Sequence, residues 1–200
     1  MRPSSPDIDA AFSAPGVVLV EGISDKLALE ALARRLGRDL DAEGVSVLPI
    51  GGAQAIGKVL DRLGPGGVGV KLAGLCDAAE ERHFQRALER AGFGSNLGRA
   101  DLEALGFYVC DADLEDELVR SLGAAVVEGV IEAEGEWASF QTFQKQPEKR
   151  KLTREAQLHG FMWNRKIRYA RLLVDALDLA HVPRPLDRVL AHVHSEYAPG

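Results

Sequence analysis

Residues 17–33 (VVLVEGISDKLALEALA) constrain the fold more than any other stretch of the chain. The first four are apolar, as in a short buried strand, and the run ends at Glu21. The next residue is a glycine, which permits a tight turn, and Asp25 has the charge that is favoured in the first turn of a helix. We therefore expect a strand, a turn and a helix. Glu21 would then lie at the carboxyl end of the strand, where open α/β sheets bind ligands.

The same alternation continues toward the middle of the chain. Apolar runs typical of strands recur at residues 45–48, 68–76 and 107–110, and helical periodicity covers residues 24–36, 53–63 and 79–91. Strands that alternate with helices in this way predict an α/β fold. We expect a mostly parallel four-stranded sheet flanked by helices.

Beyond about residue 118 the strand signals disappear. Helical patterns cover residues 126–133, 137–143, 153–162 and 166–179, and a last helix ends near residue 194. We therefore predict a flexible N-terminal arm (1–15), an α/β domain (16–122) and a C-terminal helical extension that carries basic residues (123–200). The aromatic residues of this extension are expected to pack its interior rather than to stack on bases: Trp137, Phe140, Phe143, Phe161 and Trp163.

Composition narrows the class of protein. The formal net charge is −6, which is not the overall charge of a protein held to nucleic acid by bulk electrostatics. No apolar run approaches the roughly 20 residues needed to cross a bilayer, so no membrane partner is expected. The first residues lack the layout of a signal peptide, and the chain has only two cysteines, Cys76 and Cys110. We expect a cytoplasmic protein with two buried thiols.

Acidic residues recur just past the ends of the predicted strands. They are Glu21, Asp77, Asp111 and the run at 113–117, and Asp25 joins them from the start of its helix. Any one of them could be a helix cap or a solvated surface residue. Several at one sheet edge would repel one another, and a divalent cation such as Mg²⁺ would relieve that repulsion. Two such ions can clamp the attacking and leaving oxygens of a phosphodiester.

Five motifs in order resemble the Toprim domain, and most closely that of the OLD (overcoming lysogenisation defect) nucleases. They are EGISD at 21–25, the glycine turn PIGGA at 49–53, LCDAAE at 75–80, DLEDEL at 113–118 and NRKIRYA at 164–170. The resemblance extends from about residue 17 to residue 193. It implies a Toprim (Rossmann-like) fold and a metal-dependent endonuclease that hydrolyses phosphodiester bonds in DNA by a two-metal mechanism.

The resemblance also implies a set of site residues. The first ion would be held by Glu21, Asp25 and Asp77, completed by Glu115 or another acid of the 113–117 run. Glu80 and Glu117 are candidates for a second ion, and Asp113 shares a helix face with Glu117. The expected ions are Mg²⁺ or Mn²⁺, and Ca²⁺ can also bind. The expected catalytic residues are Glu21, Asp25, Asp77 and Lys166.

The chain departs from the Toprim pattern at residue 79. Many Toprim proteins have Asp-x-Asp after the third strand, whereas this chain has Asp77, Ala78 and Ala79. Glu80 is one residue further on and can take the place of the second aspartate. The departure therefore bears on the second metal site more than on the first.

Basic residues complete the expected site. Lys166 lies between Arg165 and Arg168, where a cation could stabilise the charge of the scissile phosphate. A second basic group would hold the nucleic-acid backbone without reading sequence: Lys145, Lys149, Arg150 and Lys151. Both groups could instead be ordinary solvated surfaces.

Two alternatives remain open at this point. One is a non-catalytic Toprim module that binds nucleic acid or a partner in DNA repair or phage defence, and the other is an RNA-processing nuclease. OLD proteins typically fuse an ATPase to this domain, but the sequence contains no G-x-x-x-x-G-K-[ST] run. A separate ATPase partner is therefore expected if ATP takes part, and the oligomeric state is left open.

Overall fold

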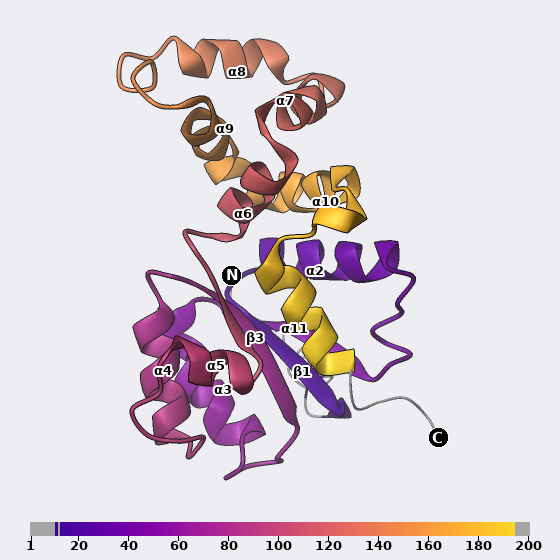
Figure 1. Cartoon of the computed structure of the whole chain (residues 1–200), viewed down its shortest axis with the longest axis vertical. Helices are drawn as coiled ribbons and strands as arrows, with labels where there is room; N and C mark the ends of the chain where they lie inside the picture. The colour runs from indigo at the N-terminus through magenta and orange to yellow at the C-terminus, as the bar shows by residue number, and fades with distance from the viewer. Residues whose placement is uncertain (1–10, 12, 195–200) are drawn as a thin grey trace.

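The computed structural model describes residue 11 and residues 13–194, and its centre is a four-stranded parallel sheet (Figure 1). The strands are β1 (Gly16–Val20), β2 (Val45–Pro49), β3 (Lys71–Asp77) and β4 (Phe107–Cys110), in the order β2-β1-β3-β4. Every neighbouring pair is parallel. The predicted α/β class is confirmed, and all four carboxyl ends lie at the same edge of the sheet.

Helices cover both faces of this sheet, because the side chains of a strand alternate between its two faces. Val18 and Val20 of β1 join one core cluster with α2 (Ile23–Arg35), and Val17 and Leu19 join the other. The second cluster is covered by α3 (Ile56–Leu63), α4 (Glu81–Arg90) and α5 (Arg99–Ala104), and a short η1 (Ala53–Ala55) precedes α3.

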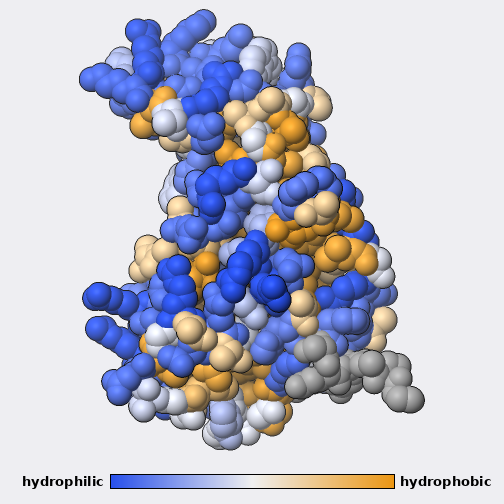
Figure 2. Space-filling view, viewed as in Figure 1, coloured by the Kyte–Doolittle hydropathy of each residue, from blue (hydrophilic) through white to orange (hydrophobic). Residues whose placement is uncertain are grey.

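The remaining helices follow β4, and all but the last of them build a head that stands beyond the carboxyl edge of the sheet. They are α6 (Leu114–Leu122), α7 (Ala124–Ala133), α8 (Trp137–Gln144), α9 (Arg154–Met162), η2 (Trp163–Arg165), α10 (Lys166–Ala176), η3 (Leu179–His181) and α11 (Arg184–His194). Of these, α7, α8 and α9 form the outer end, and Figure 2 shows the molecule narrowing below them. α10 packs on α2, and α11 returns along β3.

The helical region shares its interior with the sheet. Buried Phe140 and Phe161 of the head belong to the same core cluster as Val18 of β1. The predicted packing role of these two phenylalanines is confirmed, as is the burial of Cys76 and Cys110. The division after residue 122 stays a prediction.

The structure corrects several details. The third strand begins at Lys71, not at residue 68, and the helix after Arg165 ends at Ala176, not at residue 179. Helix α5 was not anticipated. Most of the predicted N-terminal arm lies outside the described residues, but Ala11 is buried in the second core cluster. None of the helices in the described part of the chain combines the length and apolar character needed to cross a membrane.

Candidate metal centre

Three carboxylates meet at the carboxyl edge of the sheet, as the strand ends predict. Glu21 follows β1, Asp25 lies in the first turn of α2, and Asp77 ends β3. Glu21 Oε1 accepts a hydrogen bond from the Asp77 amide at 3.5 Å. Asp25 Oδ2 accepts one from the Gly22 amide at 2.8 Å, so Asp25 also caps its own helix.

The glycine turn after β2 fixes the backbone of Glu21. The amides of Gly51 and Gly52 both donate to the Glu21 carbonyl oxygen, at 3.0 and 3.1 Å. Both glycines have positive φ, 78° and 109°, which a residue with a Cβ rarely adopts. The glycine turn at 49–53 therefore holds the backbone of the 21–25 motif in place through these two hydrogen bonds.

The environment of the three carboxylates makes their charged forms costly. Burial, together with the charges of neighbouring carboxylates, raises the pKa of Asp25 to about 7 and that of Asp77 to about 8. Burial and the charge of Glu80 raise the pKa of Glu21 as well. A divalent cation bound here would favour the charged forms of all three.

Lys166 at the start of α10 faces two further acids from the start of α6. Its Nζ donates to Glu115 Oε2 at 2.7 Å and to Asp113 Oδ2 at 3.2 Å. Burial lowers the Lys166 pKa, but the bond to Glu115 outweighs it and the pKa rises. The sequence predicted Lys166 and these acids for one site, and the structure brings them together.

His159 of α9 belongs to this group and was missed by sequence reasoning. Its Nε2 lies 2.9 Å from both Asp113 oxygens. Although burial raises the Asp113 pKa, the bonds from His159 and the Asp116 amide, with the charge of Lys166, lower it to about 2. No local signal in the sequence pointed to it, because His159 and Lys166 belong to two separate helices, α9 and α10.

Two buried carboxylate oxygens have no hydrogen-bond partner among the described residues, Glu80 Oε2 and Glu115 Oε1. Glu115 is only 2% exposed. Such orphaned acceptors are costly unless a donor or cation satisfies them. The donor set, all hard carboxylate oxygens, fits Mg²⁺ or Mn²⁺. Within residues 11 and 13–194, however, no group of three or more His, Cys, Asp or Glu side chains is already arranged around a metal position.

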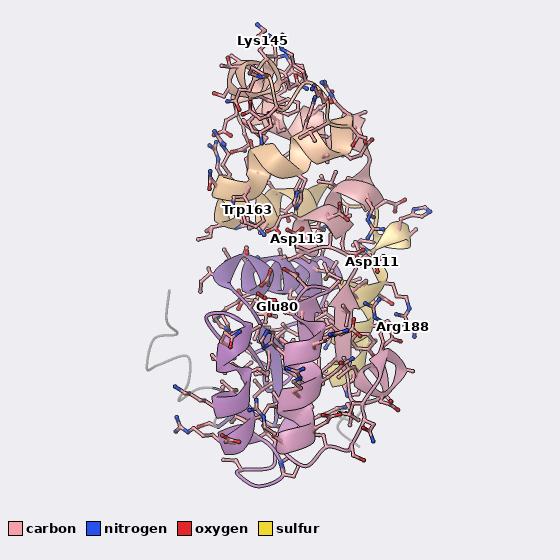
Figure 3. The ribbon with its side chains drawn as sticks, turned by 90° about the vertical axis from the view of Figure 1, so that its left-hand side faces the viewer. Glu80, Asp111, Asp113, Lys145, Trp163 and Arg188 are labelled. Atoms are coloured by element: carbon pink, nitrogen blue, oxygen red, sulfur yellow. The ribbon has the colours of Figure 1, made fainter. Side chains whose placement is uncertain are left out.

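The structure does not bring Glu117 to the other carboxylates. Its Oε1 accepts from the Asp111 amide at 2.9 Å and lies 2.8 Å from the Arg120 guanidinium. Glu117 and Asp111 line a separate pocket with Arg99, Arg120 and Arg184. Figure 3 places Asp111 to one side of Asp113, whereas Glu80 lies below Asp113.

The basic residues fall into two groups. Lys145, Lys149, Arg150 and Lys151 lie on the turn between α8 and α9, and Figure 3 places Lys145 at the tip of the molecule, far from Glu80. Arg165 and Arg168 both pair with Glu136, at 3.1 and 2.6 Å, and Arg168 also pairs with Glu134. These two arginines therefore link the start of α10 to the segment between α7 and α8 by ion pairs.

Comparison with known proteins finds a sequence match in the first part of the chain. A family model described as the TOPRIM domain of overcoming lysogenization defect protein-like proteins matches residues 12–78. No curated protein matches the chain.

Two solved structures extend the likeness beyond the matched region. The C-terminal region of the Burkholderia pseudomallei OLD protein has 23% identity and a TM-score of 0.71, covering 92% of this chain and 99% of that one. The C-terminal region of the Xanthomonas campestris pv. campestris OLD protein has 24% identity and a TM-score of 0.72, covering 92% and 94%. The predicted resemblance is confirmed: residues 12–78 match the OLD-like TOPRIM family model, and the chain has the fold of the C-terminal region of OLD proteins.

Proposed function

We propose that this chain is a divalent-metal-dependent nuclease that hydrolyses phosphodiester bonds in DNA. The observation that carries the proposal is the convergence of Glu21, Asp25 and Asp77, all with raised pKa values, at one sheet edge close to Lys166. A site that disfavours its own negative charge, and that has one lysine facing it, fits a cation and a phosphate bound side by side.

The carboxylates divide between two ions in this proposal. Glu21, Asp25 and Asp77 hold the first, together with Glu115, whose Oε1 accepts no hydrogen bond from any residue that the structure describes. Glu80, with its buried Oε2, takes the place of the aspartate that Ala79 replaces and serves a second ion, for which Asp113 is a further ligand in this proposal. When bound, Mg²⁺ or Mn²⁺ would polarise the phosphate and lower the pKa of the attacking water.

Lys166 provides the positive charge that the carboxylates cannot. Its ammonium is held between Glu115 and Asp113 and would stabilise charge on the non-bridging phosphate oxygens. His159 is a positioning residue, because it fixes the Asp113 carboxylate that in turn orients Lys166.

The basic turn between α8 and α9 would contact the DNA backbone away from the scissile bond. Because this turn lies far from Glu80 in Figure 3, it would contact a part of the DNA molecule away from the metal centre. Phosphate contacts of this kind position the substrate without selecting sequence.

A non-catalytic binding module is the second candidate. It is favoured by the salt bridges of Lys166, which neutralise Asp113 and Glu115 without any ion, and by Ala79 in place of the second aspartate. Such a module would bind DNA equally well in the presence of a chelator.

The experiment that separates the two is cleavage of plasmid and single-stranded DNA in a series of Mg²⁺, Mn²⁺ and Ca²⁺. We expect metal-dependent cleavage that is lost in Glu21→Ala and Lys166→Ala and retained in Glu132→Ala, a control at an exposed position of α7. Cleavage that survives Glu21→Ala would contradict the assignment. DNA binding without cleavage under all conditions would support the binding module.

A further inference from the structure

Trp163 is exposed beside the candidate metal centre. It lies in η2, between α9 and α10, and is 58% exposed, whereas Phe140 and Phe161 of the same region are buried. The expectation that this tryptophan packs the interior is therefore wrong. Tryptophan is a residue that proteins mostly bury, so an exposed indole next to a site points to a ligand.

The indole is tied to the site through two side chains. The Lys166 ammonium lies 4.6 Å from the ring centroid, and the His159 ring meets it edge-on at a centroid distance of 6.3 Å. Both of these side chains also contact Asp113. Figure 3 places Trp163 near Asp113, on the opposite side from Asp111 and well below Lys145.

Ile167 is a second exposed apolar side chain near the start of α10. It is 61% exposed. The Trp163 ring and the Lys166 cation therefore lie together at the start of α10. Single-stranded nucleic-acid sites combine basic side chains, which hold the backbone, with aromatic rings on which bases stack.

We propose that Trp163 stacks on an unpaired base of the substrate, whose phosphate lies at Lys166. This inference rests on the proposed function, because it takes the metal centre as the place of the scissile phosphate. One sugar joins the base and the phosphate of a nucleotide, so adjacent cation and indole suit the two parts of a single nucleotide. The faces of paired bases are hidden inside a duplex, so the preferred substrate is single-stranded or locally unpaired DNA.

Binding without turnover tests the inference directly. Anisotropy of a fluorescein-labelled oligothymidine, measured in EDTA and in Ca²⁺, would be compared with a hairpin duplex of the same length. We expect Trp163→Ala to weaken single-strand binding roughly 10- to 100-fold, and duplex binding much less, with Trp163→Phe close to wild type. Unchanged single-strand affinity in Trp163→Ala, or no wild-type binding to the single strand, would overturn the inference.

Intrinsic fluorescence provides an independent readout. The chain has two tryptophans, so Trp137→Phe leaves Trp163 as the only reporter. Stacking predicts that oligothymidine quenches its emission, and the absence of quenching at saturation would overturn the proposal. Sedimentation that shows Trp163→Ala dissociating a dimer without changing DNA binding would instead identify a protein interface and overturn it too.

The same measurements separate this inference from the proposed function. If wild-type protein binds oligothymidine and its tryptophan emission is quenched, but it never cleaves DNA, the nuclease proposal is contradicted and the stacking site stands. If wild type and Trp163→Ala cleave single-stranded DNA equally fast, the nuclease proposal stands and the stacking site is contradicted.

Discussion

The ammonium of Lys166 lies 2.7 Å from Glu115 Oε2, although the two residues are 51 positions apart. The contact joins the start of α10 to the start of α6, and Glu115 is almost fully buried. Lys166, the candidate catalytic cation, is therefore also the ion-pair partner of the buried Glu115 carboxylate. Its removal is expected to lower the stability of the fold as well as the rate of cleavage.

Lys166→Ala is expected to destabilise the metal-free protein by about 1–3 kcal/mol, because Glu115 keeps its buried carboxylate without a partner. This is less than for a fully buried pair, since Lys166 is 26% exposed. Urea unfolding in EDTA measures the loss. The double variant Lys166→Met with Glu115→Gln should recover most of it, and losses that simply add would show that the two residues are not coupled.

Asp77→Asn is expected to stabilise the metal-free protein at high pH. The folded pKa of Asp77, about 8, lies above its ordinary value of 3.8, so the folded state binds the proton more tightly than the unfolded state. The free energy of unfolding that the protonated Asp77 contributes to wild type is therefore lost as the pH rises from about 4 to about 8. The Tm of the variant should exceed that of wild type by a few degrees at pH 8.5, at roughly 2–4 °C per kcal/mol, and the difference should shrink toward pH 5.

The control for this prediction is Asp61→Asn, at an exposed position of α3, which should show no such pH-dependent difference. Added Mg²⁺ should reverse the order, because the ion stabilises wild type and not Asp77→Asn. A variant that is less stable than wild type at every pH would indicate that Asp77 is stabilising as a charged group.

Local patterns were enough to predict the sheet and its acidic edge. Each of the four strands is a short apolar run, and Glu21, Asp77 and Asp111 follow the runs directly, so their common edge required only parallel strands. Helix α5 was missed because it is short and lies between glycine-rich turns, with Leu102 as its one buried residue.

The pairings within the site could not be derived from the sequence. His159 and Asp113 meet because α9 packs on α6, and nothing local specifies that contact. Glu117 shares a helix face with Asp113, yet the bonds to Asp111 and Arg120 turn its carboxylate away from the other acids. Trp163 looked like another interior aromatic because composition does not distinguish an exposed ring from a buried one.

Glu80→Gln is expected to weaken metal binding, whereas Glu117→Gln is not. Glu80 lies close enough to Glu21 to raise its pKa and has a buried oxygen with no hydrogen-bond partner in the described part of the chain, but Glu117 is bonded elsewhere. The increase in Tm with rising Mn²⁺ concentration measures the difference, because an ion that binds only the folded state stabilises it. Equal losses in both variants would place Glu117 at the ions after all.

Lys149→Ala combined with Lys151→Ala is expected to weaken DNA binding without changing the metal dependence of cleavage. Both lysines lie on the turn between α8 and α9, and Figure 3 places Lys145 of the same turn far from Glu80, so we expect them to act on the phosphate backbone alone. Each lost phosphate contact should reduce the slope of log affinity against log salt by about 0.9 on duplex DNA. Lys58→Ala, at an exposed position of α3, removes one positive charge elsewhere and should leave the slope as it is. An unchanged slope in the double variant would mean that the basic turn is a solvated surface, and that the strand is held only near Lys166 and Trp163.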